Sequence, residues 1–164
     1  SLAASVTEMH GDVTHLIKGL TGMPHRTELV LEKNGVKWIN DSKATNVDST
    51  LTALYSCEKP TILLLGGKDK KGDFTQLVNE INRACSMVIT FGGAAELIYS
   101  QLEGKVNVPV VKSGWLKDAV ETAHKEPAKG TVILSPGCAS YDEFNNFEER
   151  GDAFARYVRE IENA

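Results

Sequence analysis

The sequence predicts an α/β domain built on a mostly parallel β-sheet with helices covering both faces. Short, continuous apolar runs alternate with amphipathic helical patterns along most of the 164 residues, and this alternation is typical of β-α-β units. Near the start, the pair Asn34-Gly35 separates two strand-like segments, and such a pair is a strong hairpin signal. We therefore expect a β-hairpin ahead of the parallel strands.

Each predicted element follows from its own pattern. The hairpin strands are the apolar segments 29–31 and 36–39, which flank the Asn-Gly pair. Aliphatic and β-branched runs predict buried strands at 61–65, 87–91, 108–111 and 131–134. Apolar residues at helical spacing predict helices at 46–57, 74–84, 94–103, 115–125 and 141–162. In the last helix, Phe154 and Tyr157 are expected to pack into the core.

Residues 23–164 are predicted to form one domain, preceded by a separate piece at 1–22. The first 20 residues form short helical patterns that are too small for a core of their own, and Thr21-Gly22-Met23-Pro24 then marks a boundary. The remaining length is sufficient for a single sizeable core.

The composition excludes several classes of protein. The net charge is −4 without a basic stripe, which argues against nucleic-acid binding, and no apolar run is long enough to span a membrane. The cysteines Cys57, Cys85 and Cys138 are odd in number and far apart. This argues against a disulfide framework or a zinc site and fits a reducing compartment. We therefore expect a soluble cytoplasmic domain with no nucleic-acid or membrane partner.

Unusual polar chemistry follows three of the predicted strands. In a parallel sheet, ligands bind beyond the carboxyl ends of the strands. The segments 40–46, 66–73 and 135–140 occupy such positions, and all three are rich in polar, charged or glycine residues. A ligand site is therefore predicted where these three loops meet.

The loop 40–46 (Asn-Asp-Ser-Lys-Ala-Thr-Asn) joins a strand to a helix. Backbone N–H groups at a helix start favour anions, Lys43 adds a positive charge, and Asp41 offers an acceptor. A structural alternative is a polar turn in which Thr45 or Asn46 caps the helix. The nearby Arg26 is either a planar clamp for phosphate or a surface arginine.

The loops 66–73 and 135–140 allow both functional and structural interpretations. Gly66-Gly67 followed by three lysines could receive a carboxylate or phosphate, but the loop lacks the spacing of a phosphate-binding motif and could be a solvated basic turn. Ser140-x-x-Glu143 predicts a capping box at the start of the last helix, which leaves the serine hydroxyl free to donate. Cys138 could be a nucleophile, although a buried packing role is the better interpretation.

Read in order, these motifs resemble one family. They are Pro24-His25-Arg26, the loop 40–46, Gly66-Gly67 with Lys70, and Ser135-Pro136-x-Cys138-Ala139-Ser140, extended by Phe144, Phe147 and Arg150-Gly151. Together they resemble the UDP-N-acetylmuramoyl-L-alanine:D-glutamate ligases, the MurD family of Mur ligases, from about residue 15 onward. The resemblance implies a Rossmann-like, three-layer C-terminal domain that closes over a central ATPase domain, with residues 1–22 as the tail of that domain.

The resemblance also implies an activity for the complete enzyme. It would use ATP and Mg²⁺ to activate the carboxylate of UDP-MurNAc-L-alanine as an acyl phosphate, which the amine of D-glutamate then attacks. The Mg²⁺ ligands would lie mainly outside this chain, and no catalytic residue is assigned within it. The chain alone is expected to be inactive, and the enzyme is expected to be a cytoplasmic monomer.

The resemblance assigns two sets of contacts by motif. The set that would bind D-glutamate is Thr45, Lys70, Ser140, Tyr141 and Phe147. The set that would face ATP or its phosphates is His25, Arg26, Asp41 and Lys43. Lys68 and Lys71 lie close to Lys70 in the sequence, so any of the three lysines could be the one that binds the carboxylate.

Two other functions are compatible with such a fold. One is a dehydrogenase-like nucleotide-binding domain, which the missing dinucleotide fingerprint argues against. The other is a non-catalytic regulatory or interaction module that has kept the fold.

Overall fold

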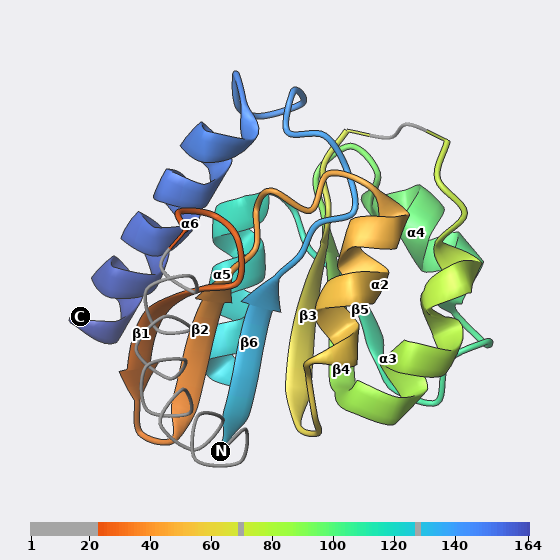
Figure 1. Ribbon diagram of the computed structural model, residues 1–164, viewed down its shortest axis with the longest axis horizontal. Helices are drawn as coiled ribbons and strands as arrows, with labels where there is room; N and C mark the ends of the chain where they lie inside the picture. The colour runs from red at the N-terminus through yellow and green to blue at the C-terminus, as the bar shows by residue number, and fades with distance from the viewer. Residues whose placement is uncertain (1–22, 69–70, 127–128) are drawn as a thin grey trace, which may run out of the picture.

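The computed structural model describes residues 23–68, 71–126 and 129–164 (Figure 1). The N-terminal piece 1–22, which includes the first half of the boundary motif, and the candidate ligand Lys70 lie outside the described residues. The predictions made for them therefore stay predictions.

One six-stranded sheet runs through the described residues, in the order β1-β2-β6-β3-β4-β5. Its strands are β1 (Glu28–Lys33), β2 (Val36–Asn40), β3 (Thr61–Gly66), β4 (Cys85–Phe91), β5 (Val110–Lys112) and β6 (Gly130–Leu134). The pair β1–β2 is antiparallel, and every other neighbouring pair is parallel. The mostly parallel sheet with an N-terminal hairpin is thus confirmed.

The hairpin turn forms where the Asn-Gly pair predicted it. Asn34 and Gly35 have φ values of 55° and 81°, and positive φ at both central residues is the geometry of the tight turn that suits the twist of paired strands. The turn leaves β2 beside β6 in parallel register, with Asn40 opposite Leu134. The polar loop after β2 therefore begins beside the end of β6.

Helices cover both faces of the sheet and complete a three-layer domain (Figure 1). They are α2 (Val47–Tyr55), the 3-10 helix η1 (Phe74–Leu77), α3 (Val78–Ala84), α4 (Ala95–Leu102), α5 (Leu116–Lys125) and α6 (Phe147–Glu162). One core packs α2, α3 and α4 against one face, and a second core packs α5 and α6 against the other.

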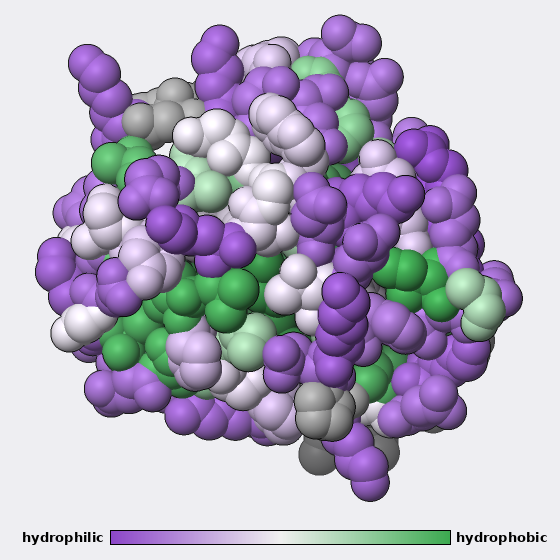
Figure 2. All heavy atoms as spheres, turned by 180° about the vertical axis from the view of Figure 1, so that it is seen from behind, coloured by the Kyte–Doolittle hydropathy of each residue, from purple (hydrophilic) through white to green (hydrophobic). Residues whose placement is uncertain are grey.

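Alternation along β3 explains the two cores. All six residues of β3 are buried. Leu63 and Leu65 belong to the core beneath α2 to α4, whereas Ile62 and Leu64 belong to the core beneath α5 and α6. Successive side chains of a strand point to opposite faces, so a continuous apolar run is what a doubly covered central strand requires. The exterior behind the sheet is mainly hydrophilic, with a smaller area of hydrophobic side chains (Figure 2).

Two helix predictions need correction. The predicted helix 74–84 is divided into η1 and α3, which meet at Leu77–Val78. The predicted helix 141–162 begins only at Phe147, and its cap is Asn146, whose side chain accepts a hydrogen bond from Glu149 N at 2.7 Å. The capping-box interpretation of Ser140 and Glu143 is therefore wrong, because residues 141–146 form turns that lead into the helix.

The strand order places a switch point between β6 and β3. After β3 the chain continues to β4 and β5 on one side, and it then returns to form β6 on the other side of β3. Connections diverge at such a point and leave a crevice at the carboxyl ends of the strands. None of the helices in the described residues is long and apolar enough to cross a lipid bilayer.

Candidate functional site

The three polar loops meet at the switch point and are joined by backbone hydrogen bonds. Gly66 N donates to Pro136 O at 3.0 Å and Lys68 N donates to Ala139 O at 2.8 Å, which ties the second loop to the third. Gly137 N donates to Ala44 O at 2.9 Å, which ties the third loop to the first. The segments 40–46, 66–68 and 135–140 thus form one continuous wall, which we call the loop cluster.

Gly67 allows the closest approach within the loop cluster. Its φ is 135°, and a Cβ atom there would lie 2.4 Å from Ala139 O and 3.0 Å from Cys138 Cβ. Only glycine fits such an approach without moving backbone. The same crowding explains Cys138, which is 1% exposed and belongs to a hydrophobic core. The packing interpretation of this cysteine is therefore confirmed.

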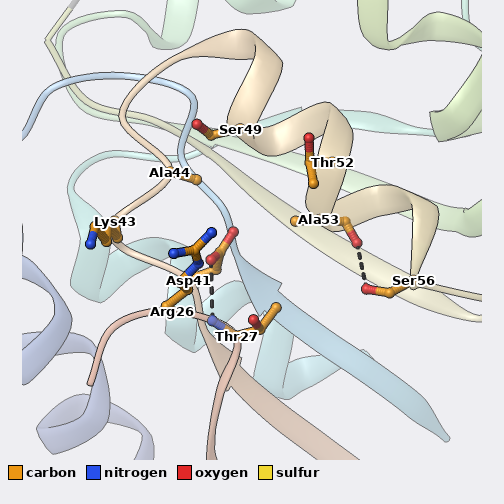
Figure 3. Close-up of a pocket in the computed structure, with 9 residues that line it drawn as sticks. All are labelled: Arg26, Thr27, Asp41, Lys43, Ala44, Ser49, Thr52, Ala53 and Ser56. Carbon is orange, nitrogen blue, oxygen red and sulfur yellow. Dashed lines mark hydrogen bonds between the residues drawn. The ribbon is translucent and has the colours of Figure 1, made fainter. Parts of the chain in front are cut away.

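A cavity of about 480 Å³ opens between the first loop and α2 (Figure 3). One wall carries Arg26, Asp41 and Lys43, and the Arg26 side chain points toward the Asp41 carboxylate. The opposite wall is formed by α2 and its C-terminal cap, which present small and hydroxyl side chains. Its residues are Ser49, Thr52, Ala53 and Ser56. The cavity therefore has cations, a carboxylate and hydroxyls on its lining.

Asp41 is held firmly at the base of this cavity. It is 6% exposed, accepts a hydrogen bond from Ser135 Oγ at 2.7 Å and accepts another from Thr27 N at 3.1 Å. Burial raises the pKa of the Asp41 carboxyl above its ordinary value, and the two hydrogen bonds and the charge of Arg26 oppose this only in part. The ionised form of Asp41 therefore costs the folded chain stability at neutral pH.

The isosteric change Asp41→Asn is expected to raise the thermal unfolding midpoint at pH 7. The pKa of Asp41 is raised in the folded state. Below the pKa of the unfolded state, about 3.9, the carboxyl is protonated in both states and folding is not destabilised. Above the folded-state pKa the carboxyl is ionised in both states, and the full loss of stability is present. The difference between variant and wild type should be largest at pH 7 and vanish near pH 4. Thermal unfolding of the chain between these values measures it.

Asp48→Asn is the matched control for this change. Asp48 is exposed in the first turn of α2, where a carboxylate favours the helix by roughly 0.5 kcal/mol. Its replacement should lower the midpoint at pH 7, which is the opposite sign. A lower midpoint for Asp41→Asn at pH 7 would show that its hydrogen bonds outweigh its burial.

His25 lies apart from the cavity, unlike the other three residues predicted to face ATP. Its side chain is buried, with Nδ1 3.1 Å from Asn40 Nδ2 and Nε2 3.6 Å from Asp152 Oδ1. The ring meets Phe147 edge-on, with centroids 6.2 Å apart. Its carbonyl oxygen accepts a hydrogen bond from Lys43 N at 3.0 Å. The His25 ring therefore joins the first loop to α6, and its backbone supports Lys43.

The residues predicted to contact D-glutamate differ in exposure. Ser140 is buried in the third loop, Thr45 and Phe147 are half-buried, and Tyr141 is 64% exposed. Phe147 is fixed to the first loop, because its carbonyl oxygen accepts a hydrogen bond from Ser42 Oγ at 2.7 Å. The candidate Lys70 lies outside the described residues, in the gap between Lys68 and Lys71.

Two acidic side chains anchor the turn that follows Ser140. Asp142 Oδ2 accepts a hydrogen bond from Gly93 N at 2.9 Å, just before α4. Glu143 Oε2 accepts one from Leu116 N at 3.3 Å, at the first residue of α5. Carboxylates are stabilised at helix starts, so these two contacts hold the Ser140–Tyr141 segment across the edge of the sheet. No local sequence pattern indicates either contact, because each partner lies far away along the chain.

Positively charged side chains and hydrogen-bond donors predominate in the described part of the site. Within residues 23–68, 71–126 and 129–164, no group of three or more histidine, cysteine or acidic side chains is arranged to hold a metal ion. The loop cluster instead offers backbone amides, hydroxyls and a neighbouring cavity with Arg26 and Lys43. Such groups suit carboxylate and phosphate oxygens.

The chain resembles curated ligases over most of its length. It is 43% identical to the UDP-N-acetylmuramoylalanine--D-glutamate ligase of Bacteroides thetaiotaomicron over 98% of the chain. It is 45% identical to the ligase of the same name from Chlorobium limicola over 87% of the chain. The aligned regions amount to only 38% and 30% of the lengths of these two relatives.

Solved structures show the same fold. The chain aligns with MurF ligase from Thermotoga maritima in complex with ADP at a TM-score of 0.54 and 19% identity, covering 85% of this chain and 32% of that one. It aligns with folylpolyglutamate synthase from Thermotoga maritima at a TM-score of 0.51 and 20% identity, covering 85% and 30%. Residues 25–138 match the family described as "Mur ligase, glutamate ligase domain". Because this match covers most of the chain, the chain belongs to the family of Mur ligase glutamate ligase domains.

Proposed function

We propose that the chain is the D-glutamate-binding, C-terminal domain of a UDP-N-acetylmuramoyl-L-alanine:D-glutamate ligase. Family membership and the names of the two curated relatives support this assignment. The observation that carries it is the loop cluster, in which three strand-end loops are hydrogen-bonded at the switch point beside a cavity with Arg26, Asp41 and Lys43.

The complete ligase would join two substrates at the expense of ATP. The carboxylate of UDP-MurNAc-L-alanine would take the terminal phosphoryl group, and ADP would leave. The amine nitrogen of D-glutamate would then form the amide bond, inorganic phosphate would leave, and the spare amine protons would pass to solvent. This chain would contribute by positioning the amine close to the activated carbonyl.

D-glutamate brings two carboxylates to the loop cluster. In the proposal, Lys70, the hydroxyls of Thr45 and Ser140, and the backbone near Tyr141 and Phe147 contact them. Lysine and hydroxyl donors suit carboxylate oxygens, and bonds to charged groups contribute about 1.5–3 kcal/mol each. Because Tyr141 is 64% exposed, its backbone would matter more than its ring.

ATP would lie against the cavity beside the loop cluster. The lining fits a nucleoside triphosphate, because Arg26 and Lys43 supply positive charge and Asp41 can accept a hydroxyl. His25 would act indirectly, through its hydrogen bond to Lys43 N. Mg²⁺ would accompany the phosphates, with its ligands mainly in other parts of the complete enzyme. We expect that enzyme to be a cytoplasmic monomer.

Steady-state kinetics of a complete ligase that contains this chain test the proposal. Lys70→Ala and Ser140→Ala should each raise the KM for D-glutamate by about tenfold or more, because each removes a bond to a charged group. The KM for ATP should change far less. Lys68→Ala and Lys71→Ala, made separately, identify which lysine binds the carboxylate.

Two exposed residues provide matched controls. Lys117→Ala in α5 and Ser100→Ala in α4 remove the same groups from exposed positions on distant helices. Both should leave every KM unchanged, and the isolated chain should release no phosphate. If the wild-type ligase did not join D-glutamate to UDP-MurNAc-L-alanine, the proposed function would be refuted. A normal turnover with unchanged KM values in all variants would refute only the residue assignments and favour a supporting module.

A further inference from the structure

Arg150 is a buried arginine that reaches the loop cluster from α6. It is 1% exposed. Its Nε donates to Ser42 Oγ at 2.9 Å, its Nη2 donates to Ser42 O at 2.8 Å, and its Nη1 donates to Cys138 O at 3.0 Å. A single side chain on a helix therefore holds the backbone of the first loop and of the third loop.

The guanidinium also lies against the second loop. A Cβ atom built on Gly67 would be 3.0 Å from Arg150 Nη1, so the glycine backbone packs directly on this nitrogen. Arg150 consequently contacts all three loops at the point where they converge. Among the side chains of the described residues, this combination of contacts with the three loops is found only for Arg150.

The guanidinium of Arg150 donates its hydrogen bonds to the loops rather than to a neighbouring carboxylate. In the part of the chain that the structure describes, no carboxylate oxygen lies within 4.0 Å of its nitrogens. Burial lowers the pKa of Arg150 to about 10, which still leaves the group charged at neutral pH. Burying a charged group destabilises the fold unless its N–H groups are hydrogen-bonded. Here the N–H groups of Arg150 donate to two carbonyl oxygens and one hydroxyl.

We propose that Arg150 is a positioning residue that locks the three loops into the geometry required to bind D-glutamate. This inference rests on the proposed function and deepens it. A planar guanidinium donates in several fixed directions, whereas a lysine ammonium is a single point on a flexible stem. Lysine at this position could reach Ser42 or Cys138 but could not span both.

The test uses a complete ligase that contains this chain, with D-glutamate turnover by the wild type established first. Arg150→Lys and Arg150→Met should each raise the KM for D-glutamate by about tenfold, which corresponds to about 1.4 kcal/mol of lost binding. The KM for ATP should change at least several-fold less. The reason is that Asp41 keeps its own bonds to Ser135 and Thr27 in both variants.

A control on the same helix separates this role from general loss of an arginine. Arg159 is exposed near the end of α6, and Arg159→Met should leave both KM values unchanged. If Arg150→Met lowered the unfolding midpoint but kept the D-glutamate KM within about twofold of wild type, Arg150 would be structural only and the proposal would be overturned. Full recovery of the KM by Arg150→Lys would also overturn it, because the planar fork would then be unnecessary.

Ser42→Ala keeps the proposal testable if the Arg150 variants do not fold. It removes the bond from Arg150 Nε and the bond from Ser42 Oγ to Phe147 O, and it leaves the two bonds from Arg150 to carbonyl oxygens. A loss of about 0.5–1 kcal/mol predicts a smaller rise of the D-glutamate KM, roughly twofold to fivefold. An unchanged KM in this variant counts against the proposal. If the wild-type ligase did not join D-glutamate to UDP-MurNAc-L-alanine, the proposed function itself would be refuted, and the inference on Arg150 depends on that function.

Discussion

Gly67→Ala is expected to lower the thermal unfolding midpoint of the chain by about 10 °C. The new Cβ would lie 2.4 Å from Ala139 O, which is backbone and cannot rotate away, and the residue would keep a φ of 135°. A strained backbone costs about 1–3 kcal/mol and overpacking a similar amount. A combined loss of about 3 kcal/mol corresponds to roughly 6–12 °C for a domain of this size.

The same change should also weaken the loop cluster as a site. Relief of the clash requires the second and third loops to separate, which would disturb the pairing of Lys68 with Ala139. In a complete ligase the KM for D-glutamate should therefore rise by about tenfold or more. Gly93→Ala is the control, because its Cβ would meet only ordinary contacts of 3.6 Å or longer. If both variants had the same midpoint, the close approach at Gly67 would not exist as described.

Gly151→Ala is also expected to destabilise the chain. A Cβ atom at this position of α6 would lie 2.0 Å from His25 Nδ1 and 2.9 Å from Asn40 Nδ2. Alanine would gain about 1 kcal/mol of helix propensity, but overpacking at a buried contact costs about 1–3 kcal/mol or more. The expected net result is a loss of about 2 kcal/mol, or roughly 4–8 °C in the unfolding midpoint.

A double-mutant cycle with His25→Ala tests the cause of this loss. Truncation of His25 removes the ring that the new methyl group would meet, so the two changes should not be additive. The double variant is expected to be more stable than the sum of the single changes predicts. Additive effects within about 0.5 kcal/mol would mean that Gly151 is required for another reason.

The parts of the fold that the sequence predicts well depend on local signals. Asn34-Gly35 produces its tight turn, and Asn46 caps α2 through a hydrogen bond from Ser49 N at 2.8 Å. The aliphatic runs correctly place the strands, so the three loops that follow could be expected to meet. Phe154 is buried in the core as predicted, and Tyr157 is partly buried against it.

The start of α6 shows where local patterns fail. Ser140-x-x-Glu143 has the spacing of a capping box, but the Glu143 carboxylate accepts its hydrogen bond from Leu116 N instead. A distant helix start thus competes successfully for the acid, and Asn146 becomes the cap. A sequence pattern contains no information on that partner.

His25 and Arg150 show the same limit within the site. The prediction that His25 faces ATP stays a prediction, but motif order could not indicate that its ring is held between Asn40 and α6. Arg150 was noticed only as an extension of a motif, since nothing local indicates that its side chain reaches Ser42, 108 residues away. Long-range contacts of this kind require coordinates.

The most direct test of the whole account is a crystal structure of the complete ligase with its UDP-MurNAc-L-alanyl-D-glutamate product. We expect both carboxylates of the D-glutamyl group to lie within hydrogen-bonding distance of groups from all three loops, including Thr45, Lys70 and Ser140. A D-glutamyl group bound elsewhere on the domain, or held by one loop alone, would contradict the claim that the three strand ends form a single binding site.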